Sequence, residues 1–446
     1  MSDPGAPCEV HVLVPRLGGG EVLVQEESIG QPALPVVRLP GEAGERPGSI
    51  FDGVRRSSTA FDGLLGIQAV EVDERWRTTL ALVEAEVAEV APAGYAWAPA
   101  DVVLATTRPE PVRAALERSL CAAATPAGEG SAPWFVPGWR ARTSAWMGDR
   151  LAERGRSMTE EPRVVHAGPV SVVLRAETAT GPVFHKATVR HFAQEATILE
   201  ALGRGTPGWV PEVLAVDPSV GSLMAPMGGR ELADDPPETW DRGLRRLAEL
   251  QVAWASRTPE LLAAGAPARG LRALAGRVEA MEGVFDALVR LEPDAWFAWP
   301  DLAAGLCARI LSLAASPISE TLVHGDLHPG NVQVDGDEVR VFDWSDGAIA
   351  HPFVDLAVFL RHLPTPAERR RMVDAYLEPW SAGYERAALE RAVADAPAVG
   401  AVYQVVTYLA LVPALDPRDR WQYADAPPRW LRAALRPLEV APAGST

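Results

Sequence analysis

The stretch that decides the fold reads Leu322-Val323-His324-Gly325-Asp326-Leu327-His328-Pro329-Gly330-Asn331-Val332-Gln333-Val334, then Asp335-Gly336-Asp337, then Val339-Arg340-Val341-Phe342-Asp343-Trp344. Two apolar runs flank an Asp-Gly turn, which predicts a β-hairpin. Asp326 and Asn331 stand at its entrance and Asp343 at its exit. Phosphoryl transfer needs a carboxylate for the proton of an attacking hydroxyl, and oxygen ligands for magnesium across nucleotide phosphates. The stretch supplies these residue types in the order His-x-Asp-Leu-x-x-x-Asn of a kinase catalytic loop.

Each of these side chains, taken alone, also fits a structural role. Asp326 could be a turn residue, Asn331 a cap and Asp343 a carboxylate at a strand end. Their combination with the intervening hairpin favours phosphoryl transfer. We group His324 with the catalytic residues and expect it to brace the loop by hydrogen bonding, with proton transfer as the alternative. His328 could support the loop or lie near the phosphates.

Lysine is nearly absent from the chain. Of 42 basic residues only Lys186 is a lysine, which leaves 42 − 1 = 41 arginines. A position that carries the compact ammonium of lysine, and not the planar guanidinium of arginine, indicates that a point charge is needed there. Lys186 falls on the third of three predicted strands, where a kinase places the lysine that contacts the α- and β-phosphates. The helix predicted from Phe192 to Leu202 offers Glu195 as its ion-pair partner, with Glu200 as the alternative.

Two further segments could contact a nucleotide. The connection between the first two strands of this predicted unit reads His166-Ala167-Gly168-Pro169-Val170-Ser171, where protein kinases carry a glycine-rich loop. Gly168 and Ser171 could meet a phosphate there, and a plain turn is the alternative. Met224 to Met227 lies where a hinge would hold adenine, so we predict backbone contacts from Ala225 and Met227.

The H-G-D-L-H-P-G-N-V stretch, the V-F-D-W that follows it and the segment His351–Ala357 resemble the aminoglycoside phosphotransferase family. The resemblance covers residues 133–438. It implies an α+β, bilobal protein-kinase-like fold with a small antiparallel β N-lobe and a helical C-lobe. It also implies ATP or GTP as donor, Mg²⁺ as cofactor and a small-molecule acceptor with a free hydroxyl.

The resemblance further implies roles by position. Asp326 would be the base, Asn331 and Asp343 the magnesium ligands, and Asp355 a structural acid of the C-lobe. Trp344-Ser345 departs from the D-F-G of protein kinases, as is usual for this family. The expected domains are a cap-like α+β module, a linker, the kinase N-lobe and the C-lobe: 1–107, 108–136, 137–226 and 227–446.

The N-terminal module carries little sign of chemistry. Two apolar runs, His11–Pro15 and Glu21–Gln25, are separated by glycines and predict a hairpin. The strand order resembles a Nudix-like domain, but Arg55–Thr59 stands where such hydrolases carry a Glu-rich magnesium helix. We therefore expect a non-catalytic cap, similar to that of actinobacterial maltokinases and glucosamine kinases.

Composition limits the partners. A net charge of 42 − 59 = −17 argues against gripping nucleic acid or an anionic membrane. The uncharged run Ala396–Leu415 is long enough to span a bilayer, but its prolines and polar residues favour a buried core helix. Three scattered cysteines and an N-terminus without a signal-peptide pattern indicate the cytoplasm.

These observations favour a kinase that phosphorylates an antibiotic, as in aminoglycoside resistance, or a sugar or amino sugar. The alternative is a nucleotide-binding, pseudokinase-like scaffold. A protein kinase is disfavoured because there is no A-P-E segment and no glycine triad. The acidic C-lobe suits a cationic acceptor and equally a solvated surface, so the acceptor and the oligomeric state stay open.

Overall fold

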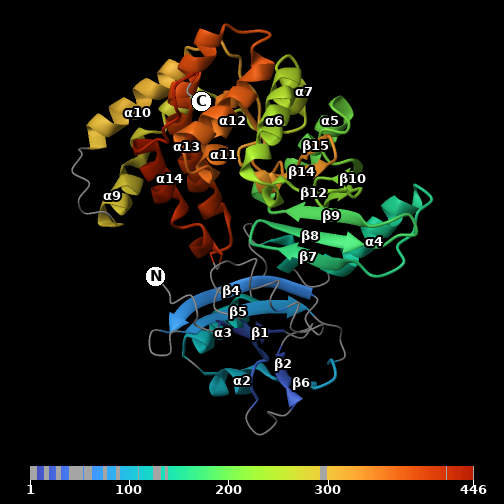
Figure 1. Cartoon of the computed structure of the whole chain (residues 1–446). Coiled ribbons are helices and arrows are strands. Elements are labelled where there is room, and N and C mark those ends of the chain that lie inside the picture. The colour runs from blue at the N-terminus through green and yellow to red at the C-terminus, as the bar shows by residue number, and fades with distance from the viewer. Residues whose placement is uncertain are drawn as a thin grey trace. The chain divides into compact units, whose positions relative to one another are not determined.

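The computed structural model describes residues 8–14, 20–26, 32–39, 54, 63–73, 78–86, 91–108, 110–123, 132–135, 139–291, 299–417 and 419–444. The Arg55–Thr59 segment lies outside these residues. The chain forms two compact units, Met1–Arg190 with Leu415–Asp419, and His191–Ala414 with Arg420–Thr446. Strands dominate the first unit and helices the second (Figure 1).

The first unit begins with a mixed sheet in the order β3-β1-β5-β4. Its strands are β1 (Cys8–Leu13), β3 (Val36–Leu39), β4 (Gly63–Asp73) and β5 (Thr78–Glu86). β1 pairs antiparallel with β3 and parallel with β5, while β4 and β5 are antiparallel. A separate antiparallel pair joins β2 (Glu21–Gln25) to β6 (Tyr95–Pro99). Helices α2 (Ala100–Thr106) and α3 (Glu110–Ala123) follow, and α3 occupies part of the range expected to be a linker.

The hairpin predicted between the first two apolar runs is replaced by two separate pairings. β1 belongs to the four-stranded sheet and β2 to the pair with β6. A backbone hydrogen bond from Leu23 N–H to the Val14 carbonyl (3.0 Å) still joins the ends of the two runs. Val10 and Val12 are fully buried, and β1 has a neighbouring strand on each edge. Local glycine spacing could not reveal that the partner β5 lies far along the chain.

Three consecutive antiparallel strands follow: β7 (Arg163–Ala167), β8 (Ser171–Ala176) and β9 (Val183–Thr188). They confirm the predicted strands. Lys186 pairs with Val173 across β8 and β9. His185, its neighbour, is fully buried and lies near Trp139 and Trp146 of α4 (Trp139–Ala152), with ring centroids 6.1 and 5.6 Å apart. Because side chains alternate along a strand, Lys186 lies on the opposite face from His185.

The second unit contains short strands that position the decisive loop. They are β10 (Val213–Asp217) with β11 (Gly221–Met224), β12 (Arg230–Glu231) with β14 (Val332–Asp335) and β15 (Glu338–Val341), and β13 (Thr321–Val323) with β16 (Ala348–Ala350). β14 and β15 pair antiparallel, with Val332 opposite Val341. Gly336 takes a φ of +59° in their turn. The predicted hairpin is therefore confirmed.

Helices make up most of the second unit. They are α5 (Glu195–Gly205), α6 (Asp241–Trp254), α7 (Thr258–Ala263), α8 (Leu271–Ala275), α9 (Glu282–Leu291), α10 (Trp299–Ala314), α11 (Leu356–Phe359), α12 (Pro366–Trp380), α13 (Arg386–Ala414) and α14 (Ala426–Leu435). By length and composition α13 could cross a membrane, yet 67% of its apolar window is buried within the protein. It packs against α10, α11 and α14, which supports its interpretation as a core helix.

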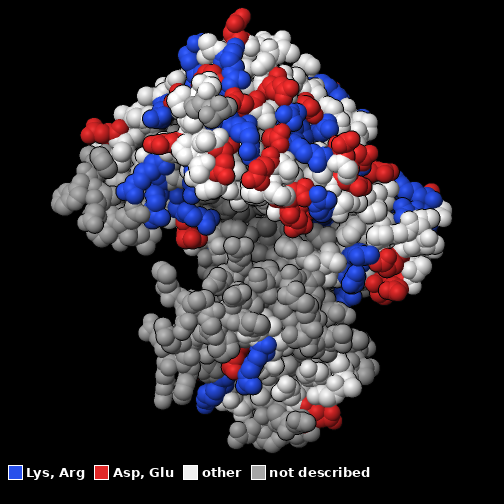
Figure 2. All heavy atoms as spheres, viewed as in Figure 1, with Lys and Arg blue, Asp and Glu red and all other residues white. Residues whose placement is uncertain are grey.

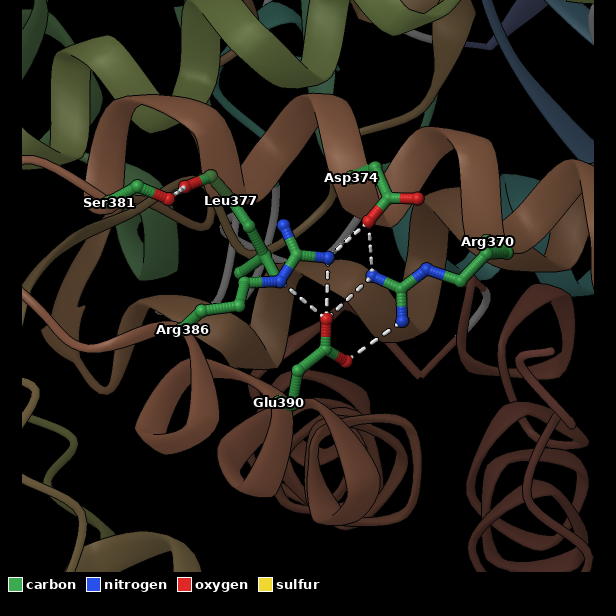
Figure 3. Close-up of polar contacts among 6 residues, drawn as sticks. All are labelled: Arg370, Asp374, Leu377, Ser381, Arg386 and Glu390. Atoms are coloured by element: carbon green, nitrogen blue, oxygen red, sulfur yellow. Dashed lines mark hydrogen bonds and ion pairs between the residues drawn. The ribbon is translucent and has the colours of Figure 1, made fainter. Parts of the chain in front are cut away.

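An ion network joins α12 to the start of α13 (Figure 3). Arg370 donates to both oxygens of Glu390, at 2.8 and 3.1 Å, and to Asp374 at 2.6 Å. Arg386 bonds the same two carboxylates. Arg370 is almost fully buried, so its paired carboxylates offset the cost of taking its charge out of water.

The expected α+β fold class, with small antiparallel sheets and a mainly helical C-terminal part, is confirmed. On the face in Figure 2, acidic and basic side chains are interspersed over the helical part.

Candidate active site

The loop after β13 begins at a position that requires glycine. Gly325 has a φ of +83°, in the left-handed region that other residues rarely adopt. A Cβ on it would lie 2.6 Å from Asp346 Cβ and 2.7 Å from the Asp346 carbonyl oxygen. The Gln404 side-chain amide on α13 donates to the Gly325 carbonyl. Glycine stands in the arginine place of the protein-kinase loop because two backbone segments meet here.

Asp355 holds the backbone of this loop from the protein interior. Its Oδ2 accepts from His324 N–H (2.9 Å) and its Oδ1 from Gly325 N–H (2.8 Å). Gln251 Nε2 also donates to Oδ2 at 2.9 Å, and Gln251 Oε1 accepts from the Tyr376 hydroxyl at 2.5 Å. Burial raises the pKa of Asp355 to about 7, and its hydrogen bonds oppose that rise. Its contacts fit the structural acid that the sequence suggested.

His324 links the two ends of the hairpin. Its Nε2 lies 2.9 Å from the Phe342 carbonyl oxygen, and Asp326 N–H donates to its Nδ1 at 3.3 Å. A carbonyl can only accept, so Nε2 carries the hydrogen and Nδ1 accepts, which corresponds to the neutral ring. The ring is fully buried and lies 4.7 Å from that of Trp344. Both nitrogens bond backbone groups, as expected for a side chain that braces the loop.

Asp326 and Asn331 lie at opposite ends of the same short loop. Asn331 Nδ2 donates to the Asp326 carbonyl at 3.0 Å. The amide nitrogen is thus bonded within the loop, and the amide oxygen can bind a ligand. Burial first, then the carboxylates of Asp346, Asp343 and Asp355, raise the pKa of the Asp326 carboxyl well above its usual value. A carboxyl with a raised pKa accepts a proton more readily near neutral pH.

Asp343 has an unusual backbone conformation. Its φ is +64°, and among the described residues it is the one non-glycine with a positive φ. Such a conformation costs on the order of 1–3 kcal/mol, and strain of this kind concentrates at ligand sites. Phe342 N–H donates to the Asn331 carbonyl at 3.0 Å, so the chain brings Asp343 next to the Asn331 end of the loop.

A serine connects Asp343 to α5. Ser345 Oγ lies 2.8 Å from Asp343 Oδ1 and 3.0 Å from Glu195 Oε2. Gln194 Nε2 also donates to the Ser345 carbonyl at 3.3 Å. Glu195 is 5% exposed, so its carboxylate meets this hydroxyl in the protein interior. The first turn of α5 is thereby tied to the segment that carries Asp343.

Asn331 and Asp343 are the predicted magnesium ligands. Among the described residues, no group of three or more His, Cys, Asp or Glu side chains has a metal-binding arrangement. Mg²⁺ is commonly held by one or two carboxylates, with waters and substrate phosphates completing its shell. One amide oxygen and one carboxylate therefore fit a magnesium ion that is shared with a nucleotide.

The predicted phosphate contacts Lys186, Gly168 and Ser171 belong to the first unit. Lys186 is half-buried on β9. Gly168 N–H donates to the Ser171 carbonyl at 2.9 Å, which closes a tight turn between β7 and β8. Glu195 belongs to the second unit, so its ion pair with Lys186 stays a prediction.

The predicted hinge contacts already have partners for some backbone groups. Ala225 N–H donates to the Glu212 carbonyl at 3.0 Å, and the Met227 carbonyl accepts from Arg340 at 2.8 Å. An adenine base would have to use the other backbone groups of this segment. The adenine contact stays a prediction.

Three residues of the site escaped sequence reasoning: Gln251, Ser345 and Gln404. Gln251 and Gln404 are buried polar side chains in helices whose other buried residues are mostly apolar. A lone amide in a buried run is a usable signal, because a buried polar group needs a partner. Ser345 stands two residues after Asp343 and carried no signal of its own.

Comparison with known proteins identifies the family. Residues 159–390, slightly more than half of the 446, match the profile of the phosphotransferase enzyme family, APH. A macrolide 2'-phosphotransferase from Brachybacterium faecium is 19% identical, covering 66% of this chain and 99% of its own, with a TM-score of 0.42. A choline/ethanolamine kinase family protein from Mesorhizobium loti is 18% identical, covering 66% and 95%, with a TM-score of 0.44. Both likenesses are distant, and no curated protein matches.

The matched range contains the β7–β9 strands, the Asp326 loop and Asp355. The resemblance proposed from the H-G-D-L-H-P-G-N-V stretch is therefore confirmed, and with it the protein-kinase-like α+β fold class. The chain belongs to the phosphotransferase enzyme family.

Proposed function

We propose that the protein moves the γ-phosphoryl group of ATP or GTP to a hydroxyl of a small molecule in a magnesium-dependent reaction. One observation carries this proposal. Asp326, Asn331 and Asp343 occupy one short hairpin whose backbone is held by the buried carboxylate of Asp355 and by His324. Such extensive support favours a site that must keep its geometry during chemistry.

The proposed reaction assigns a role to each member of the loop. The acceptor oxygen attacks the γ-phosphorus, the bond to the β–γ bridging oxygen breaks, and the nucleoside diphosphate leaves. The acceptor proton passes to the Asp326 carboxylate, whose raised pKa favours uptake. Asn331 and Asp343 hold magnesium, which when bound neutralises charge on the phosphate oxygens. His324 positions the loop without contacting the reacting atoms.

The proposed nucleotide contacts are those that the sequence predicts. Lys186 contacts the α- and β-phosphates, and Glu195 orients it as an ion-pair partner. Four further residues complete the proposed site, with Gly168 and Ser171 near the phosphates and the backbone of Ala225 and Met227 at the base. In this proposal residues 137–226 act as the kinase N-lobe and residues 227–446 as the C-lobe.

The acceptor is a small hydroxyl compound, such as an aminoglycoside, another antibiotic, a sugar or an amino sugar. The module at 1–107 acts as a cap without chemistry of its own, joined to the lobes by 108–136. The protein works in the cytoplasm. These assignments go beyond the chemical class of the family, because they name a range of acceptors and a location.

A matched pair of aspartate variants tests the proposal. Asp326→Asn removes the base, whereas Asp337→Asn makes the same change at an exposed position in the turn of the same hairpin. Nucleoside diphosphate release is measured with ATP and with GTP, with and without Mg²⁺, against aminoglycosides, nucleoside antibiotics and sugars. Because a general base contributes roughly 10²–10⁴-fold, Asp326→Asn should lower acceptor-dependent turnover by that factor.

The control should keep wild-type turnover, and both variants should still bind nucleotide in calorimetry. The alternative of a pseudokinase-like scaffold predicts a different result. In that case wild type and both variants bind nucleotide equally and no acceptor stimulates its consumption. That result would refute the proposed function.

A further inference from the structure

Two arginines and two histidines gather beside the Asp326 loop. His328 belongs to the loop, Arg361 and His362 end the short 3-10 helix Leu360–His362, and Arg429 lies on α14. The rings of His328 and His362 are 5.8 Å apart. The Arg361 guanidinium lies over the face of Trp430, 5.0 Å from the ring centroid. Residues far apart in the chain thus bring their positive or protonatable groups to one place.

The cluster of Arg361, His362, Arg429 and His328 lacks ion pairs with carboxylates among the described residues. Within the described part of the chain, no ion pair joins Arg361, His362 or Arg429 to an acid, and Asp343 is the one carboxylate that acts on His328. Burial first, and then the neighbouring Arg429 charge, lowers the pKa of Arg361. Burial and Arg361 likewise lower the pKa of His362. The two arginine charges therefore repel each other, and a bound anion would offset this repulsion and favour the protonated form of the two imidazoles.

Several other arginines of the second unit are paired with acids. Arg257 forms a bidentate pair with Glu260, at 2.8 and 2.7 Å, and Arg370 does the same with Glu390. Others have hydroxyl or carbonyl partners instead, as Arg269 has in Thr407 and Arg369 in the Glu439 carbonyl. Stacking on Trp430 gives Arg361 a packing role. His328 also has a structural contact, since its Nδ1 accepts from the Gly330 N–H at 3.1 Å, which leaves the placement of His362 and Arg429 without such an explanation.

The cluster lies next to α14, which carries both Arg429 and the Trp430 ring under Arg361. Burial first raises the pKa of the Tyr408 phenol on α13, the Asp326 carboxylate raises it further, and Arg429 opposes them. Arg429 and Asp326 therefore both act on the same hydroxyl. The rings of Tyr408 and Tyr423 stack with their centroids 6.0 Å apart. His328 is two residues from Asp326 in the chain.

We propose that Arg361, His362, Arg429 and His328 form an anion-binding subsite for a phosphate or carboxylate group on the small-molecule side of the reaction. The inference rests on the proposed function and extends it. The anion is either an acidic group that the acceptor carries from the start or the phosphoryl group newly attached to it. Arginine forks match both anions in shape and charge. In the proposed reaction Asp326 acts as the base. Recognition of the substrate's anionic group is therefore assigned to the cluster of arginines and histidines.

Direct binding of inorganic phosphate tests the subsite without requiring turnover. The full chain is saturated with ADP and Mg²⁺, and phosphate is titrated by calorimetry. The double variant Arg361→Gln, Arg429→Gln is compared with Arg371→Gln, an exposed arginine on α12. Loss of charge-assisted hydrogen bonds should weaken phosphate binding roughly tenfold or more in the double variant. The control should match wild type. Equal binding by all three proteins, or no phosphate binding by wild type, would overturn the subsite.

Kinetics then separate the two sources of the anion. Glucose, glucuronate and glucosamine share a hydroxylated ring and differ in charge. A KM that rises in the double variant for glucuronate alone assigns the subsite to the acceptor's own anion. A lower kcat and weaker product inhibition with a neutral acceptor assign it to the transferred phosphoryl group. A change confined to the KM for ATP overturns the inference. Absence of turnover in wild type refutes the proposed function, while phosphate binding still decides the subsite.

Discussion

Replacing Gly325 by alanine tests how the catalytic loop is held. The left-handed backbone costs a non-glycine residue about 1–2 kcal/mol. The added Cβ would also lie 2.6 Å from Asp346 Cβ and 2.7 Å from its carbonyl oxygen, and overpacking of this kind costs about 1–3 kcal/mol. We therefore expect Gly325→Ala to destabilise the loop by about 2–5 kcal/mol, the sum of the two terms.

Gly336→Ala is the matched control, because it changes the same residue type in the turn of the same hairpin. Gly336 has a φ of +59° and nothing within 4 Å of an added Cβ, so only the backbone term applies. Hydrogen exchange of the loop peptide, followed by mass spectrometry, reports the local opening free energy. His324 and Gly325 amides, which donate to Asp355, should lose protection in Gly325→Ala and keep it in Gly336→Ala. Equal effects of the two substitutions would show that the close approach to Asp346 contributes nothing.

Three further predictions concern the loop and its supports. Ser345→Ala should raise the Mg²⁺ concentration needed for half-maximal turnover by roughly tenfold, because the hydroxyl that orients a metal carboxylate is lost, and Ser345→Thr should restore it. Burial and then the Asp346 carboxylate raise the pKa of Asp326, which must be ionised to act as the base. In Asp346→Asn the acid limb of the pH profile of kcat/KM should therefore move to lower pH, and an unmoved limb would contradict this. Gly400→Ala should lower the melting temperature, because a Cβ would overlap the backbone of the 3-10 helix under α13, whereas Gly305→Ala at an exposed position of α10, with nothing within 4 Å, should stabilise by about 0.5–1 kcal/mol.

Sequence reasoning reached those parts of the site that are local in the chain. Asp326, Asn331 and Asp343 lie within 18 positions of one another, and the Asp-Gly turn specifies their hairpin. Their roles stay proposals, but their proximity could be read from spacing alone. The N-terminal hairpin failed because β1 takes β5 as a parallel neighbour, and such pairings leave no local pattern.

The supports of the loop could not be foreseen in the same way. Gln251 and Gln404 come from α6 and α13, more than 70 positions from the groups that they bond. Their role depends on which backbone groups packing leaves without partners, and that is settled only when helices and strands are assembled. The same holds for Ser345 between Asp343 and Glu195, and for the cations around His328.

The sequence by itself determined the chemical class of this protein and the loop where the chemistry is proposed, because hairpin propensity and residue order act over a few neighbouring positions. It also singled out Lys186, the one lysine among 42 basic residues. Only the tertiary structure decided that Gly325 must lack a side chain, that Asp355 receives two loop amides and that Arg361 and Arg429 stand together without acids. Burial and electrostatics sum over neighbours in space, and those neighbours are chosen by the packing of distant segments.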